Sequence, residues 1–168
     1  KARAQVVKDY IAFPALAALL SGRGSLSSRG RTFKATATAN FTANIVRNHG
    51  YMVWDTLFAM DEKFDVKPQM VDKYAVSADK LTWTFTLRDG LEWHDGKPVL
   101  PEDCIASIKR WAARDSMGQK MMGSVTDFEV VDAKTFKMKM KEPYGLVLQS
   151  LGKPSSNVPF MMPKRVAE

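Results

Sequence analysis

The stretch from Leu81 to Trp111 limits what this chain can fold into more than any other part of it. Three apolar residues, Trp83, Phe85 and Leu87, alternate with threonines. This period of two predicts a half-buried β-strand with one apolar and one polar face. After an Asp-Gly break, residues 91–93 are expected to form a second short extended piece.

A tight turn and a helix follow these two extended pieces. Residues 94–98 read His-Asp-Gly-Lys-Pro, and Gly96 is expected at positive φ because Asp-Gly pairs favour such turns. Glu102 and Asp103 stand at the start of a helix expected over residues 102–113, where acidic side chains interact favourably with the helix dipole. Strand and helix each carry an apolar face, so we expect the helix to cover the strand.

The rest of the chain predicts further elements from weaker signals. A helix is expected over residues 44–60, and a short edge strand with a turn over residues 64–79. Residues 115–124 are expected to be mostly loop. The strict alternation over residues 127–142 predicts a hairpin, and residues 144–151 are expected to form a short helix.

Together these elements predict an α+β fold. A small mixed sheet is expected from the strands within residues 81–93 and the hairpin of residues 127–141. Helices near residues 44–60 and 102–113 are expected to flank it.

The positive charge of the chain is concentrated at its N-terminal end. The net charge is +7, with 25 Lys and Arg against 18 Asp and Glu. Residues 1–40 hold seven Lys or Arg and one Asp, so they contribute +6, and residues 41–168 contribute only +1. A nucleic-acid-binding domain would carry the charge on its folded body, so this distribution disfavours one.

The first thirty residues are interpreted as a leader-like or disordered arm. Basic residues precede a short apolar run over residues 11–20, which is too short to span a bilayer but suits the core of a secretion signal. A short amphipathic helix remains the other interpretation. The single cysteine, Cys104, excludes an intrachain disulfide, and its place on an apolar helix face indicates a buried side chain.

The stretch from Leu81 to Trp111 resembles the signature region of the family 5 extracellular solute-binding proteins, which serve ATP-binding-cassette (ABC) importers of peptides, nickel and related solutes. The matching elements stand in the family's order. They are Trp83 and Phe85, Arg88, Asp89-Gly90, Trp93, His94-Asp95-Gly96-Lys97-Pro98 and Glu102-Asp103. Residues 31–43 depart from the family's pattern, because they lack its Asp-Pro segment.

The resemblance implies a two-lobed, type II periplasmic-binding-protein fold, of which residues 31–168 would form the N-terminal part. Residues 44–152 would be a small subdomain, and residues 153–168 the crossover towards the first lobe. Because family members are several-fold longer, the chain resembles a fragment, and a fragment with exposed apolar surface is expected to self-associate.

The implied function is non-catalytic capture of a small solute, such as a peptide, in the periplasm or outside the cell. The solute would be delivered to an ABC transporter permease in the membrane. By the same resemblance, Asn48, His49 and Tyr51 are the expected ligand-binding residues. No cofactor, metal ligand or catalytic residue is expected, and no nucleic-acid partner.

Two other classes of function remain open from the residues alone. A small nucleic-acid-binding module would use Lys137, Lys139 and Lys141 on one face of the predicted hairpin, together with the basic arm. A small hydrolase would use His94 beside a nucleophile, although a structural turn also explains His94 and Asp95.

Overall fold

The computed structural model describes residues 25–28, 31–34, 44–154 and 157–168. The chain divides into two compact units, residues 1–53 and 54–168. The apolar run of residues 11–20, interpreted above as the core of a secretion signal or as a short amphipathic helix, lies outside the described residues. The division of the chain into an arm, a small subdomain and a crossover stays a prediction.

The first unit contains three described elements. Strands β1 (Ser25–Ser28) and β2 (Arg31–Lys34) pair as an antiparallel hairpin. Helix α3 covers Asn44–Val53. The helix expected over residues 44–60 is therefore too long. Its last part is extended instead, because Thr56 and Leu57 pair through their backbones with other segments of the chain.

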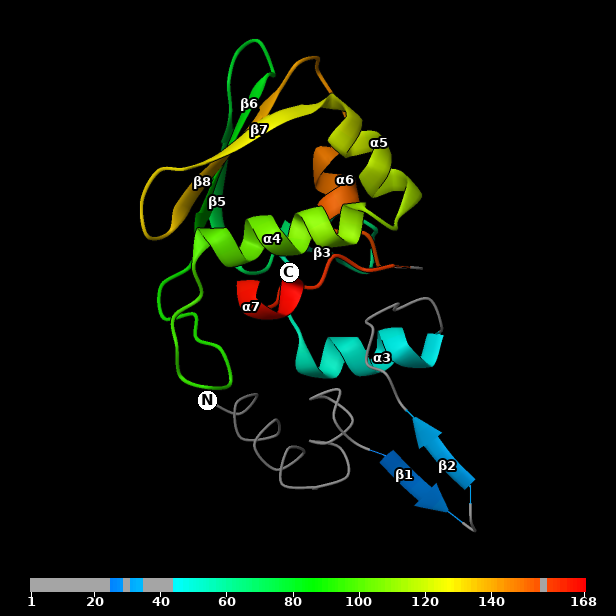
Figure 1. The fold of residues 1–168 in the computed structure, drawn as a ribbon. Coiled ribbons are helices and arrows are strands. Elements are labelled where there is room, and N and C mark those ends of the chain that lie inside the picture. The colour runs from blue at the N-terminus through cyan, green and yellow to red at the C-terminus, as the bar shows by residue number, and fades with distance from the viewer. Residues whose placement is uncertain (1–24, 29–30, 35–43, 155–156) are drawn as a thin grey trace. The chain divides into compact units, whose positions relative to one another are not determined.

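The second unit is organised around one four-stranded sheet (Figure 1). Its strands are β5 (Val71–Val76), β6 (Thr82–Leu87), β7 (Val125–Val130) and β8 (Thr135–Met140). The spatial order is β5-β6-β8-β7, and each neighbouring pair is antiparallel. The α+β class is confirmed, but this sheet is antiparallel throughout and not mixed.

A short hairpin, β3 (Phe58–Met60) with β4 (Val66–Pro68), precedes the sheet. Residues 64–79 thus contain two strands, β4 and β5, where one was expected. The second of them, β5, joins the four-stranded sheet at its edge. Residues 91–93 do not join the sheet. They make a single bridge, between Glu92 and Pro98, because the turn folds the chain back on itself.

Four helices are described in the second unit. They are α4 (Pro101–Ala112), α5 (Ser116–Ser124), α6 (Val147–Leu151) and α7 (Lys164–Ala167). Helices α4, α5 and α6 lie on one side of the sheet (Figure 1). The loop expected over residues 115–124 is wrong, because the side chain of Asp115 caps α5 by accepting hydrogen bonds from the amides of Met117 and Gly118.

The apolar faces of the sheet and of α4 share one core, as the sequence predicted. Phe85 and Phe136 are fully buried, and their ring centroids are 5.3 Å apart. Cys104, Ile108 and Trp111 of α4 belong to the same cluster. Leu87 is also buried in this cluster, and Trp83 is partly buried against it.

The turn after the second extended piece has the expected geometry. Gly96 has a φ of 77°, a conformation that glycine adopts without strain. The amide of Trp93 donates to the carbonyl of Lys97, and the amide of Gly96 to the carbonyl of Trp93. The Asp95 carboxylate accepts from the amide of Lys97. These hydrogen bonds stabilise the turn, as expected for a structural role.

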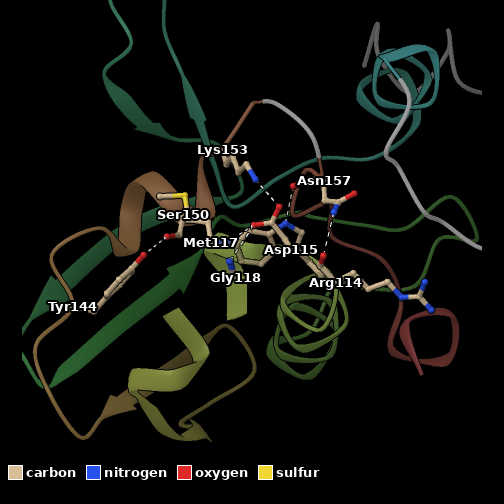
Figure 2. A network of polar contacts seen from close by, with 9 residues as sticks. Arg114, Asp115, Met117, Gly118, Tyr144, Ser150, Lys153 and Asn157 are labelled. Atoms are coloured by element: carbon tan, nitrogen blue, oxygen red, sulfur yellow. Dashed lines mark hydrogen bonds and ion pairs between the residues drawn. The ribbon is translucent and has the colours of Figure 1, made fainter. Parts of the chain in front are cut away.

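A buried ion pair joins the start of α5 to the segment after α6 (Figure 2). Lys153 Nζ lies 2.5 Å from Asp115 Oδ2, and these side chains are 16% and 3% exposed. Asp115 Oδ1 accepts from the amides of Met117 and Gly118 at 3.0 Å. A buried carboxylate needs this much compensation, because burial removes its hydration.

Polar contacts hold the C-terminal segment, residues 157–168, against α4. Ser107 Oγ accepts from the amide of Met162 at 3.0 Å and lies 3.0 Å from the carbonyl oxygen of the same residue. Trp111 Nε1 donates to the carbonyl of Asn157 at 2.7 Å. Thr56 forms a bridge with Phe160. Residues 157–168 are therefore part of the second unit's packing.

We predict that Phe85→Ala destabilises the chain by about 3–5 kcal/mol, because it leaves a cavity at the centre of the core. Such a loss is a large share of a small domain's stability. Thermal unfolding followed by circular dichroism measures it. The neighbouring Thr84→Ala, on the polar face, is the control and should matter little. A Phe85→Ala variant that melts cooperatively at the parent temperature would refute the packing.

We also predict that Asp115→Ala destabilises the chain by about 3–5 kcal/mol, because it leaves the Lys153 ammonium buried without its partner. Urea unfolding followed by tryptophan fluorescence measures the change. Asp61→Ala is a matched control, since Asp61 also accepts from two amides and pairs with a lysine, but on the surface. Equal losses in the two variants would show that burial of the ion pair is unimportant.

Candidate functional site

The expected ligand-binding residues all lie on α3. Asn48 and His49 are exposed, and Tyr51 is 44% exposed. Asn48 and Tyr51 are three residues apart, so they share one face of the helix, and His49 lies beside them. The helix therefore carries an amide, an imidazole and a phenol within one turn, and all three side chains are exposed at least in part.

The phenol of Tyr51 stays protonated at neutral pH. Partial burial raises its pKa by disfavouring the phenolate, and this outweighs the opposite effect of the nearby Arg47 guanidinium. A neutral phenol both donates and accepts hydrogen bonds. Asn48 and His49 add two further polar side chains to the same helix.

His94 has no described nucleophile beside it. Its ring meets the ring of Trp54 edge-on, with centroids 6.1 Å apart. The neighbouring Asp95 carboxylate is engaged elsewhere, by the amide of Lys97 at 3.2 Å and by Arg165 Nη2 at 2.7 Å. The hydrogen bond from Lys97 and the charge of Arg165 lower the pKa of Asp95. The geometry supports a turn and gives no support to an acid–base pair.

Of the two acidic residues at the start of α4, Asp103 has a structural role. Asp103 Oδ2 accepts from Trp93 Nε1 and from the amide of Leu100, both at 3.0 Å. Its Oδ1 accepts from the amide of Lys164 at 2.7 Å. One carboxylate thus joins the turn, the first turn of α4 and the start of α7. The sequence revealed only its place at a helix start, since the long-range partner depends on the fold.

The remaining reactive side chains are also accounted for. Cys104 is fully buried, and burial raises its pKa far above the ordinary value, so the thiol is unreactive. Within the described residues, no group of three or more His, Cys, Asp or Glu could hold a metal ion.

The lysine face of the hairpin is a surface of mixed charge. Lys139 pairs with Glu129, and the register places Lys139 opposite Asp127 and Lys137 opposite Glu129. Acidic neighbours on the same face cancel the positive field that binding to phosphates needs. The hairpin is therefore a poor nucleic-acid surface.

Among the helices in the described part of the chain, none has the length and apolar character needed to cross a membrane.

Comparisons with known proteins show which proteins this chain is similar to. The family model described as bacterial extracellular solute-binding proteins, family 5 middle, matches residues 65–167. A probable peptide ABC transporter periplasmic-binding protein of Sinorhizobium fredii, y4tO, is 44% identical over 126 residues, which are 75% of this chain and 23% of that relative. The glutathione-binding protein GsiB of Salmonella typhi is 27% identical over 153 residues, which are 90% of this chain and 29% of that protein.

A solved structure shares the fold. The binding protein AgaA of A. tumefaciens R10, in complex with agropinic acid, superposes with a TM-score of 0.65 at 23% identity, over 75% of this chain and 25% of that one. The chain thus spans about a quarter of the length of the proteins it matches. The family match extends over most of the second unit, from β4 through α7. The chain belongs to the bacterial extracellular solute-binding proteins of family 5.

Proposed function

We propose that this chain takes part in the non-catalytic capture of a small polar solute, such as a peptide, for an ABC importer. The observation that carries the proposal is the family match over residues 65–167, supported by the relative at 44% identity that is named a probable peptide ABC transporter periplasmic-binding protein. The described contacts of Asp95 and Asp103 and the burial of Cys104 give these three side chains structural roles.

The proposed contacts to the solute are Asn48, His49 and Tyr51. They are polar, exposed or half-exposed, and close together on one helix. Amide, imidazole and phenol groups offer hydrogen bonds without a fixed charge, which suits a solute with peptide groups. The capture would take place in the periplasm or outside the cell, and the partner that receives the solute would be a membrane permease.

The isolated chain of 168 residues should bind such a solute poorly. Affinity for a small molecule comes from enclosing most of its surface, and this chain spans about a quarter of the length of its relatives. Exposed apolar side chains on the second unit, among them Tyr74 and Val76, also favour self-association.

We predict that calorimetry of the isolated chain against a mixed dipeptide pool gives no measurable heat of binding. A chimera in which this chain replaces the matching part of the S. fredii relative should restore binding. In that chimera, Tyr51→Ala should weaken affinity at least tenfold, because the bound solute loses the hydrogen bonds of the phenol.

The matched control in the chimera is Tyr74→Ala, which removes a tyrosine of similar exposure from the second unit. Its affinity for the dipeptides should stay within a factor of two of the parent chimera. Micromolar binding by the isolated monomer would contradict the proposal that other parts complete the site. Equal affinities of the Tyr51 and Tyr74 variants for the dipeptides would contradict the proposal that α3 contributes to the solute-binding site.

A further inference from the structure

Strand β5 is an edge strand. On its outer side, its first residue, Val71, donates its amide to the carbonyl of Leu57 and accepts from Arg88 Nε at 3.2 Å, but no outer backbone partner is described for the residues that follow. It pairs only with β6 in the described sheet. The amide of Ser77 donates to the carbonyl of Thr82, its opposite residue, at 2.9 Å. Because bonded and non-bonded pairs alternate along an antiparallel ladder, the Tyr74–Phe85 and Val76–Trp83 pairs are non-bonded. The backbone groups of Tyr74 and Val76 therefore point away from the sheet.

Apolar side chains accompany this open backbone. Tyr74 is 42% exposed and Val76 is 38% exposed. Both share a face with Trp83 and Phe85, since opposite residues of a pair point to the same side. The ring of Tyr74 stacks on Trp83, with centroids 6.3 Å apart. The apolar face of the sheet thus continues to the β5 edge and ends there partly uncovered.

The opposite edge of the sheet is protected against pairing. Strand β7 carries Asp127 and Glu129 on one face, and its register shifts between Val125 and Asp127. Pairing of β7 with a copy of itself about an axis at Asp127, Phe128 or Glu129 would place these carboxylates directly opposite one another. Like charges and bulges are established means of blocking an edge. Strand β5 also has a register shift, between Val71 and Lys73, but the residues after it, from Lys73 to Val76, are in regular register and carry no such cluster of like charge.

We propose that β5 pairs antiparallel with β5 of a second copy of this chain, about a two-fold axis at Ala75. A two-fold axis perpendicular to the sheet leaves each side chain on the same face of the joined sheet. Directly opposite residues of an antiparallel pair must also share a face. The axis must therefore lie midway between the two copies of one residue. An axis at Lys73 would oppose two lysines, and one at Tyr74 would oppose Asp72 to Val76. An axis at Ala75 pairs Tyr74 with Val76 twice.

This register satisfies both the backbone and the side chains. Tyr74 and Val76 of one copy exchange backbone hydrogen bonds with Val76 and Tyr74 of the other, which uses the groups that point outward. Their side chains extend the apolar face across the axis. Lys73 lies opposite Ser77, so no like charges meet. The two four-stranded sheets become one continuous sheet, which supplies the surface for the self-association proposed above and does not depend on solute capture.

A single cysteine tests this register. Two Ala75 residues would form a non-bonded pair, with Cα atoms about 4.5 Å apart, which is within the range that a disulfide spans. The native Cys104 is fully buried and will not interfere. Under mild oxidation of the full chain, Ala75→Cys should form a disulfide-linked dimer at least tenfold faster than Val130→Cys, an exposed position at the other edge.

A second measurement tests the effect of a positive charge introduced at the β5 edge. Val76→Lys should raise the dimer dissociation constant at least tenfold by light scattering, whereas Val130→Lys should leave it unchanged, and circular dichroism verifies that both variants are folded. A parent chain that stays monomeric at several hundred micromolar overturns the proposal. So does cross-linking of Ala75→Cys at the rate of Val130→Cys. Neither result would bear on solute binding, which is measured separately in the chimera.

Discussion

The burial of one face of the central strands beneath α4 is the interaction on which the second unit depends. Phe85 and Phe136 lie at the middle of the sheet, and α4 covers them with Ile108 and Trp111. A sheet with one apolar face is stable only when another layer covers that face. Helix α4 is therefore the element against which α5, α7 and the C-terminal segment pack.

The polar contacts of α4 then fix segments that are distant in sequence. Asp103 binds the turn before the helix and the start of α7, and Ser107 holds the backbone of Met162. Asp115 and Lys153 fix the far end. These groups are buried and each is satisfied by specific partners, so they select one arrangement of the chain. The proposed solute contacts lie on α3, which belongs to the first unit.

The sequence predicted the parts of the fold that depend on local pattern. The alternation at Trp83–Leu87, the positive φ of Gly96 and the start of α4 were all confirmed. The errors occurred where tertiary contacts override local preference. The expected helix over residues 44–60 ends at Val53, because the next residues pair with distant segments, and α5 forms around the cap that Asp115 provides. The assignment of Asn48, His49 and Tyr51 rests on resemblance, because no local pattern identifies a ligand contact on an exposed helix.

The central claim is that α4, the sheet and residues 157–168 form one cooperative unit, and amide hydrogen exchange tests it most directly. The amides of Phe85 and Phe136 report the centre of the sheet, and that of Met162, bound to Ser107 Oγ, reports the pinned segment. The amide of Phe64, which donates only to the carbonyl of Asp61 within an exposed turn, is an internal reference for exchange by local opening. We predict that Met162 exchanges as slowly as the sheet, because both open only on global unfolding. Exchange of Met162 at the rate of Phe64, with the sheet still protected, would contradict the claim.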